Sequence, residues 1–339
     1  MRYFLGADLG GTKTHIIIAD ENGRAVGFGE GGPANHQSVG FNGMYNSLLT
    51  ALEQALDSAR LSREDICGSG FGIAGYDWPS EKPAMQATID QLNLQAPYEM
   101  VNDAIPGLVA GAENGWGVNL VSGTGCNCRG WDQNHQREGR VTGYGILMGE
   151  ASGSSELIFH AMQLVGREWT KRGPHTALSD AYIKYTGAKN LEDLIEGYTE
   201  EQYSIGAETA PLVFQTAYAG DQVARELITW AGTELGEMAC AVIRQLEFEM
   251  LSFDVVLSGS MFEGGALLID PMRAIIQKTA PGARMVRLTA PPVVGAVLIG
   301  MEQANLPITA AIRSLLAEST HEVKNNTGNH SARMESNNA

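Results

Sequence analysis

The stretch FLGADLGGTKTHIIIAD, residues 4–20, places an aspartate and a glycine-rich turn at the junction of two apolar strands. Glycine leaves backbone N–H groups uncovered, and consecutive N–H groups can cradle phosphate oxygens. The threonines of this turn add hydroxyl donors, and its lysine adds positive charge. The turn therefore predicts a phosphate-binding loop, whose candidate residues are Gly10, Gly11, Thr12, Lys13 and Thr14.

The aspartate at position 8 needs a separate explanation, because a carboxylate beside a phosphate repels it. Asp8 fits such a loop when a cation lies between the two groups. Mg²⁺ is the expected cation, reached through water because Mg²⁺ gives up its hydration shell reluctantly. A glycine hairpin with a solvated aspartate is the alternative, and this stretch alone leaves it open.

A second hairpin, GVNLVSGTGCNCRGWD (residues 117–132), repeats the strand–turn–strand pattern and also ends on an aspartate. Its turn contains Gly123, Thr124 and Gly125. Two such turns, about one subdomain apart and each flanked by apolar strands, suggest a duplicated βββαβα unit. Two glycine turns can also grip a triphosphate from opposite sides, which strengthens the phosphate interpretation of the first.

Asp103 is the candidate catalytic residue. It follows the apolar strand YEMVN, and ligands of open α/β sheets collect at the carboxyl ends of strands. A carboxylate there can orient a hydroxyl and accept its proton during phosphoryl transfer. NDAIPG also opens a helix, however, and aspartate is a good N-cap. The residues alone leave both roles open.

The elements that position these residues read as three strands (3–7, 15–19, 24–29), a helix (44–61), a strand (68–75), a helix (80–92), and a strand ending at 103. After the second hairpin the chain is mostly helical to 251, followed by a strand at 253–260 and helices at 263–278 and 292–304. We expect an N-terminal lobe (1–115), a C-terminal lobe with a helical insertion (116–305), and a terminal helix followed by a disordered tail (306–339), with the Asn- and Ser-rich tail beginning at about 318. The helix at 292–304 is a candidate to pack back onto the N-terminal lobe.

The ordered set DLGGTKT, ANH, NDA, SGTGCNC, GYGILMGEASGS and LSGS resembles the N-acetylglucosamine kinase family over roughly residues 1–305. That family belongs with the benzoyl-CoA-reductase-activator-like ATPases in the actin/heat-shock ATPase/sugar kinase superfamily. The resemblance implies an α/β, duplicated ribonuclease-H-like fold with two lobes and a central nucleotide cleft. It also implies ATP and Mg²⁺ as cofactors and a homodimer.

The resemblance also assigns roles to single positions. It gives Asp8 to Mg²⁺, Thr12 and Thr124 to the nucleotide phosphates, and Asp103 to catalysis. The adenine side would lie near Ala207 and Gly259. The sugar-binding positions fall on Asn35, Asp103, Cys126, Asn127, Gly143, Tyr144, Gly145 and Glu150. Cys126 stands where the family usually has serine, and Glu150 lies in MGEAS where it usually has GDEG, so both departures touch the sugar pocket.

The predicted function is ATP-dependent phosphorylation of an amino sugar or related hexose, with N-acetylglucosamine converted to its 6-phosphate as first choice. Glucosamine, N-acetylmuramic acid and glucose remain alternatives. A second class is an ATPase activator of an acyl-CoA dehydratase or reductase. Such an activator holds an iron–sulfur cluster with a cysteine pair, but Cys126 and Cys128 lie inside the second phosphate turn. A sugar sensor without turnover is a third class, which the presence of Asp103 disfavours.

Bulk composition limits the partners. The 339-residue chain is 44% hydrophobic and 18% charged, which is typical of a globular protein. A net charge of −16 argues against nucleic acid or anionic membranes as partners. Four cysteines without a disulfide-type pattern fit a reducing compartment, and no apolar run reaches transmembrane length. We therefore expect a cytoplasmic protein that acts on a small sugar and MgATP. His36, next to Asn35, can either line the sugar pocket or stabilise its loop, and the loop role is the first choice.

Overall fold

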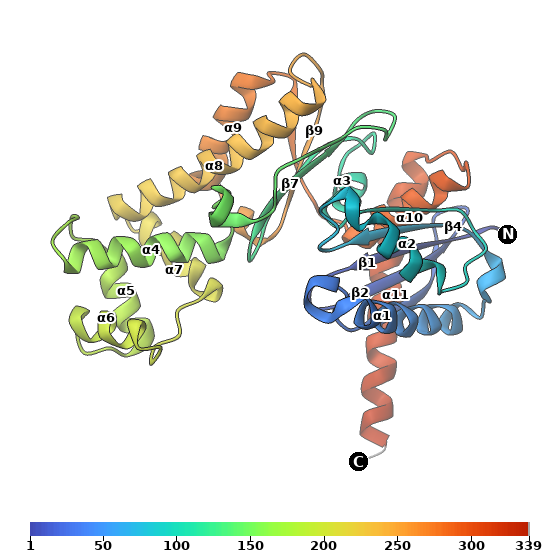
Figure 1. Cartoon of the computed structure of the whole chain (residues 1–339), viewed down its shortest axis with the longest axis horizontal. Helices are drawn as coiled ribbons and strands as arrows, with labels where there is room; N and C mark the ends of the chain where they lie inside the picture. The colour runs from blue at the N-terminus through green and yellow to red at the C-terminus, as the bar shows by residue number, and fades with distance from the viewer. Residues whose placement is uncertain (338–339) are drawn as a thin grey trace. The chain divides into compact units, whose positions relative to one another are not determined.

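The computed structural model describes the backbone of residues 1–337 and the side chains of residues 1–325. The chain divides into two compact units. Unit 1 comprises residues 1–116 and 287–339, and unit 2 comprises residues 117–286 (Figure 1). Among the described residues, no helix is both long and apolar enough to cross a membrane.

Unit 1 is a five-stranded mixed sheet in the order β3-β2-β1-β4-β5. Strands β1 and β2 pair antiparallel, as do β2 and β3, whereas β4 pairs parallel with both β1 and β5. The strands are β1 (Tyr3–Leu9), β2 (Thr14–Asp20), β3 (Ala25–Gly31), β4 (Ile66–Ile73) and β5 (Tyr98–Asn102). The helices are α1 (His36–Ala59), α2 (Lys82–Asp90), α3 (Ala104–Gly111), α10 (Pro292–Gln303) and α11 (Ala310–Asn337), with short 3₁₀ turns η1 (Arg63–Asp65) and η2 (Pro79–Glu81).

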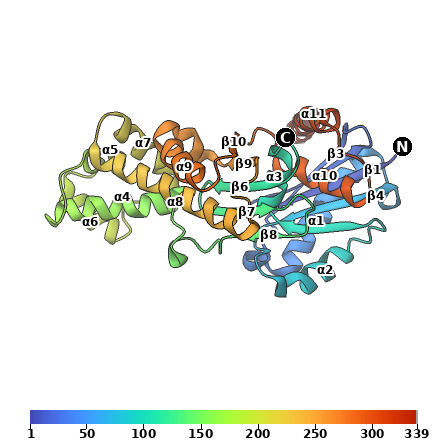
Figure 2. The same cartoon turned by 90° about the horizontal axis from the view of Figure 1, so that it is seen from above.

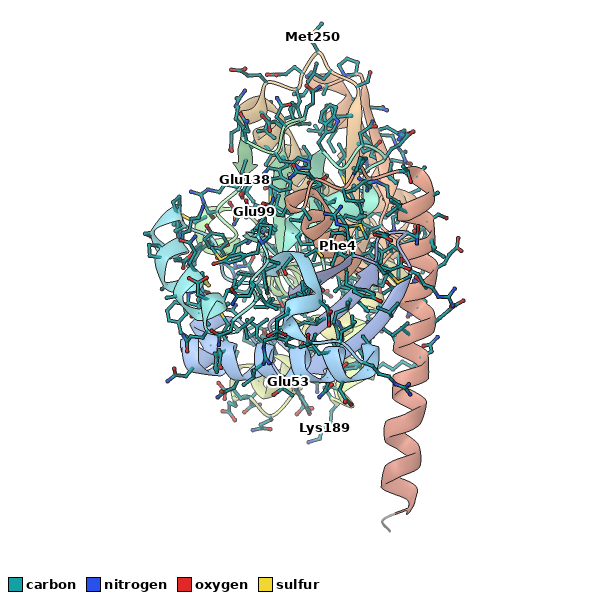
Figure 3. All side chains as sticks on the ribbon, turned by 90° about the vertical axis from the view of Figure 1, so that its right-hand side faces the viewer. Phe4, Glu53, Glu99, Glu138, Lys189 and Met250 are labelled. Carbon is teal, nitrogen blue, oxygen red and sulfur yellow. The ribbon has the colours of Figure 1, made fainter. Side chains whose placement is uncertain are left out.

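Each face of this sheet is covered by a helix that approaches the strands closely. One face packs its apolar side chains, among them Leu5, Ile16 and Phe71, against helix α1. On the other face Gly6 and Gly70 lie directly under helix α10, and a Cβ at either position would collide with its backbone. The glycines inside these strands therefore serve helix packing. Figure 3 shows buried Phe4 within unit 1 and exposed Glu53 on the outer side of α1.

Unit 2 repeats the arrangement with a five-stranded sheet in the order β10-β9-β6-β7-β8. Strand β6 again pairs antiparallel with the next strand and parallel with a strand that arrives much later in the chain. The strands are β6 (Gly117–Ser122), β7 (Cys126–Trp131), β8 (Glu138–Arg140), β9 (Phe253–Ser258) and β10 (Ala283–Arg287). In both units a hairpin is followed along the chain by a third strand on its outer side and then by two strands on the opposite side. This shared order confirms the predicted α/β duplication.

The helices of unit 2 form one layer on this sheet and a group beyond it. Helix α8 packs on strands β6, β7 and β8 and on helices α4, α7 and α9, as Figure 2 shows from above. The helices are α4 (Ser154–Trp169), α5 (Ala177–Thr186), α6 (Leu191–Thr199), α7 (Ala210–Tyr218), α8 (Gln222–Leu246) and α9 (Ala266–Thr279), with 3₁₀ turns η3 (Gly145–Met148), η4 (Ala207–Thr209) and η5 (Ser260–Gly264).

The C-terminal segment differs from two expectations. The chain returns to unit 1 at Arg287 rather than staying in the second lobe to residue 305, because helix α10 packs on β1, β4 and α3 of unit 1. The tail expected to be disordered from about 318 is instead helical to Asn337, and residues 338–339 lie outside the described residues. Helix α11 is anchored on β3 by buried Leu316, Ser319 and Thr320, which overall composition did not reveal.

Candidate functional site

The first glycine turn is a tight hairpin whose tip is exposed. The N–H of Gly10 donates to the carbonyl of Lys13 at 2.9 Å, and the carbonyl of Gly10 accepts from the N–H of Ala34 at 3.0 Å. Gly11 and Thr12 are exposed, and a Cβ at Gly11 would meet no atom within 4 Å. The turn thus presents open backbone of the kind expected for a phosphate-binding loop.

Two other residues predicted for this turn are engaged elsewhere. Thr14 is fully buried, and its hydroxyl donates to the carbonyl of Gly32 at 2.8 Å. Lys13 forms a surface ion pair with Glu30 at 2.9 Å, and His15 also contacts Glu30 at 3.1 Å. Thr14 is therefore a structural residue of the hairpin, and Lys13 can reach a phosphate only by leaving Glu30.

Asp8 lies at the carboxyl end of β1, in register with Gly72 of β4. Burial and then the negative charge of Asp103 raise the pKa of the Asp8 carboxyl to about 7, while Lys324 on α11 opposes this shift. Asp8 and Asp103 are thus close enough to repel each other electrostatically. A divalent cation would relieve this repulsion and lower the pKa of Asp8, so the donor set fits the Mg²⁺ predicted there.

Asp103 follows strand β5 and directly precedes helix α3. Its backbone is already helical (φ −57°, ψ −19°), and its side chain makes no capping hydrogen bond. The neighbouring side chain does this instead, since Oδ1 of Asn102 accepts from the N–H of Ala104 at 3.1 Å. The local geometry thus disfavours a helix cap as the main role of the Asp103 carboxylate.

Asn35 and His36 lie at the start of helix α1. Asn35 is its N-cap and accepts from the N–H of Gln37 at 2.9 Å, and its amide also packs on the backbone of Gly75, just beyond β4. His36 contacts Glu81 at 3.4 Å and stacks on Phe41. These contacts agree with the loop-stabilising role predicted for His36.

The second glycine turn, in unit 2, is held in place by its neighbours. The N–H of Gly123 donates to the carbonyl of Gly125 at 2.9 Å, and the first amides of α4 donate to the turn, Ser154 to Gly123 at 2.8 Å and Ser155 to Thr124 at 2.9 Å. Gly259 packs directly against the backbone of Ser122 and Gly123. A Cβ at Gly123 or Gly125 would meet nothing within 4 Å, so the turn is fixed and also open on one side.

A cavity of about 660 Å³ in unit 2 adjoins this turn through Ser154. Helix α7 supplies one wall and η5 another, and Tyr218 donates to the carbonyl of Gly264 at 2.7 Å between them. Its lining residues are Ser154, Ala207, Glu208, Ala210, Pro211, Phe214, Gln215, Tyr218, Ser260, Met261, Glu263 and Gly264. Of the two predicted adenine-side positions, Ala207 lines this cavity, and Gly259 directly precedes the lining residue Ser260.

Glu150 organises the loop that follows β8. Its carboxylate accepts from the backbone N–H groups of Thr142 at 2.6 Å, Gly143 at 2.7 Å and Tyr144 at 3.1 Å. Both oxygens are therefore engaged with the loop that contains the predicted sugar-binding residues. Glu150 therefore holds the backbone of this loop in place. The residue type at position 150 would affect a bound sugar through the position of the loop backbone.

Cys126 and Asn127 sit beside this loop on strand β7. The Cys126 sulfur accepts from the N–H of Ser152 at 3.4 Å, and burial raises the pKa of the thiol to about 11. Oδ1 of Asn127 lies 3.8 Å from the position that a Cβ at Gly143 would take. The structure thus brings Cys126, Asn127, Gly143 and Glu150 together within unit 2.

The Cys126–Cys128 pair is not a metal site within the part of the chain that the structure describes. Cys128 is completely buried, and burial raises the pKa of its thiol well above the usual value. No group of three or more His, Cys, Asp or Glu side chains in these described residues is arranged to hold a metal ion. Both cysteines are small buried residues of strand β7.

Sequence reasoning did not identify the N-terminus of α4 as part of the site. Glu156 accepts from the N–H of Gly153 at 2.9 Å, a capping-box contact, and Ser154 joins the second turn to the large cavity. Only part of a helix-start signal was present, because the N-cap is Gly153 and glutamate three residues later can accept from its N–H. Phe214 and Tyr218 carry no such signal, since their place in the cavity depends on how α7 packs.

Comparisons with known proteins agree with this architecture. The chain is 25% identical over 314 residues to the N-acetyl-D-glucosamine kinase of Dictyostelium discoideum, covering 88% of this chain and 97% of the relative. It is 26% identical over 308 residues to the N-acetylmuramic acid/N-acetylglucosamine kinase of Clostridium acetobutylicum, covering 90% and 100%. A crystal structure of a candidate N-acetylglucosamine kinase from Chromobacterium violaceum shares the fold with a TM-score of 0.63, at 23% identity and 88% and 99% coverage.

The family assignment follows from a match over most of the chain. The sequence profile of the BadF/BadG/BcrA/BcrD ATPase family matches residues 5–300, a span that includes both glycine turns, Asp8, Asp103 and the whole of unit 2. The chain therefore belongs to the BadF/BadG/BcrA/BcrD ATPase family.

Proposed function

We propose that the protein is an ATP-dependent kinase of an amino sugar, and that N-acetylglucosamine is the first candidate substrate. In this reaction an oxygen of the sugar forms a bond to the γ-phosphorus as the bond from that phosphorus to the β–γ bridging oxygen breaks. The two curated relatives described above, both named as kinases of N-acetylated amino sugars and each matched along nearly its whole length, support the substrate class.

One observation carries the nucleotide part of this proposal. The exposed turn Gly123–Gly125 is joined through the N-terminus of α4 to a cavity of about 660 Å³. Small-molecule sites fall between about 300 and 1,000 Å³. The cavity can take a nucleoside between Phe214 and the η5 backbone, with the phosphates toward Ser154 and the turn. The open turn of unit 1 at Gly11 and Thr12 is proposed separately as a phosphate-binding loop.

Asp103 is the proposed general base. Its carboxylate would orient the attacking sugar hydroxyl and accept its proton as the phosphoryl group leaves ATP. Asp8 would hold Mg²⁺ through water. Burial and the charge of Asp103 raise the pKa of the Asp8 carboxyl group. When bound, Mg²⁺ neutralises the charge that develops on the phosphate oxygens. We further propose a cytoplasmic homodimer, which the resemblance and the cysteine content support.

An ATPase activator is the alternative within the same family. That role needs thiolates able to hold an iron–sulfur cluster. Cys126 and Cys128 are both buried within strand β7, so neither sulfur is exposed to a cluster shared between subunits. This argument favours the kinase.

The test is ADP release measured in a coupled assay against a sugar panel of N-acetylglucosamine, glucosamine, glucose and glycerol, each with a no-sugar control. We expect the amino sugars to give the highest kcat/KM and the no-sugar rate to be low. A panel without sugar-dependent ADP release, or one in which glycerol is best, would contradict the proposed kinase.

A further inference from the structure

A second cavity of unit 2, of about 370 Å³, is lined by Gly125 of the second glycine turn and by the Gly143–Gly145 loop. Its wall combines backbone of three glycines with the side chains of Tyr144, Ile146 and Leu147. Cys126 and Glu156 complete the lining. Cys126 and Gly143–Gly145 are sugar-binding positions predicted from the sequence, so this cavity is the candidate sugar pocket within unit 2.

Glu156 is oriented by the helix that carries it. It is the third residue of α4, and its Oε2 accepts from the N–H of Gly153 at 2.9 Å. Its other oxygen, Oε1, lies 3.0 Å from the position that a Cβ at Gly145 would take. Because Gly145 lines the cavity and has no side chain, Oε1 is the carboxylate oxygen on the cavity side.

The remaining ionisable groups leave the cavity acidic. Glu150 directs its carboxylate to the backbone of the same loop. Burial raises the pKa of the Cys126 thiol to about 11, so this group is neutral at pH 7. Among the described residues that line the cavity there is no lysine, arginine or histidine. A carboxylate brought into this cavity would meet negative charge without a cation to pair with it.

We propose that Glu156 selects amino sugars that present an N–H donor and no carboxylate, so that N-acetylglucosamine and glucosamine are substrates and N-acetylmuramic acid is excluded. This inference rests on the proposed function. The amide N–H of an N-acetyl group, or the ammonium group of glucosamine, donates to Oε1 of Glu156. The acidic lactyl group of N-acetylmuramic acid is repelled by Glu156, because like charges placed together disfavour binding.

The test compares three sugars with the wild-type protein: N-acetylglucosamine, N-acetylmuramic acid, and the neutral carboxamide of N-acetylmuramic acid. The carboxamide keeps the size of the lactyl group and removes its charge. We expect kcat/KM for N-acetylmuramic acid to be at least about tenfold below that for its carboxamide. Equal values for the acid and the carboxamide would overturn the charge-based exclusion, because size alone would then set the preference.

A variant pair assigns the effect to one residue. Glu156→Gln keeps an oxygen that can accept from Gly153 and removes the charge, so we expect the ratio of kcat/KM for the acid to that for the carboxamide to rise about tenfold. Glu192→Gln is the matched control, because Glu192 is an exposed glutamate in the first turn of α6. An unchanged ratio in Glu156→Gln, in a variant that melts like the wild type, would overturn the role of Glu156.

The two levels of the proposal fail in different ways. If no sugar of the panel stimulates ADP release, the kinase function itself is wrong. If N-acetylglucosamine is phosphorylated and N-acetylmuramic acid is phosphorylated equally well, the kinase stands and the selection by Glu156 is wrong. Should Glu156→Gln melt at a much lower temperature, the wild-type comparison of acid and carboxamide decides alone.

Discussion

The two glycine turns occupy the same hairpin position in two similar sheets, yet their surroundings differ. The turn of unit 1 has a carboxylate two residues before it and a surface ion pair between Lys13 and Glu30. The turn of unit 2 has no acidic residue in its strand β6 and is held by the amides of α4 and by Gly259. The two copies of one scaffold thus differ at the turn. The copy in unit 1 has charged side chains beside it, whereas the copy in unit 2 has a rigid, open backbone with an adjoining cavity.

This difference indicates that the two units contribute different functions. Unit 1 collects Asp8, Asp103 and Asn35 at the carboxyl ends of its parallel strands, where ligands of open α/β sheets bind. Unit 2 has two cavities that are each lined in part by the first turn of α4 and by few charged groups. We therefore expect mutations in unit 1 to change turnover most, and mutations in unit 2 to change binding most.

The largest effect is expected for Asp103→Asn. Asparagine keeps the shape of aspartate but cannot accept the sugar proton, so kcat should fall at least about 10²-fold, within the usual range for loss of a general base. The melting temperature should change little, because the Asp103 side chain makes no capping hydrogen bond. Turnover and melting temperature are measured on the same preparation.

The control for this prediction is Asp221→Asn at a genuine cap. Asp221 begins α8 and accepts from the N–H of Ala224 at 2.8 Å and of Ala177 at 2.8 Å. Asparagine has one acceptor oxygen in place of two, so this variant should lose stability and keep its kcat. A near-normal kcat in Asp103→Asn would remove the catalyst from the proposed mechanism.

The second prediction tests the open face of the unit 2 turn. Gly125→Val should weaken MgATP binding at least about tenfold, because the new side chain projects into the space proposed for phosphate. The fold should tolerate it, since a Cβ at Gly125 meets nothing within 4 Å and its φ is not positive. Calorimetric titration with MgATP measures the effect. Gly11→Val, at the corresponding open glycine of the unit 1 turn, is measured in the same way for comparison. Wild-type affinity in Gly125→Val would exclude this turn from the phosphate site.

The third prediction separates two threonines of the first turn. Thr12→Val removes an exposed hydroxyl and should weaken MgATP binding by about two- to tenfold, the value of one hydrogen bond of 0.5–1.5 kcal/mol. Thr14→Val removes the hydroxyl that donates to Gly32 and should lower the melting temperature instead. Nucleotide titration and thermal unfolding of both variants decide the question. The reverse pattern would make Thr14 the phosphate ligand.

The smallest effect is expected for Asp8→Asn on stability without Mg²⁺. The folded-state pKa of Asp8, about 7, lies above the usual aspartate value of 3.8, so the folded protein holds a proton that the unfolded chain has already lost between these pH values. Stability therefore falls as pH rises from about 4 to 7. Asparagine cannot titrate, so the variant should gain melting temperature over the wild type at pH 8 more than at pH 5. Equal differences at both pH values would contradict a raised pKa.

Much of the fold could be predicted from local patterns. Both hairpins, the strand that ends before Asp103 and helix α10 follow from apolar runs bounded by glycine, aspartate and proline, and the repeated hairpin already indicated duplication. The tail could not be read in this way. Its composition is polar, but Leu316, Ser319 and Thr320 are buried on β3, and Oγ of Ser319 accepts from the N–H of Ala25 at 2.9 Å.

The sequence by itself determined the residue types of the site, because phosphate loops need glycine, a cation needs a carboxylate, and both must follow strands. Only the tertiary structure decided which of these residues are free to act. Thr14 and Glu150 have suitable side chains, yet their oxygens are engaged by Gly32 and by the backbone of residues 142–144. Glu156 was not singled out by its own pattern, yet the start of α4 turns its Oε1 toward Gly145. Residue type fixes what a side chain can donate or accept, whereas packing fixes which partner it meets.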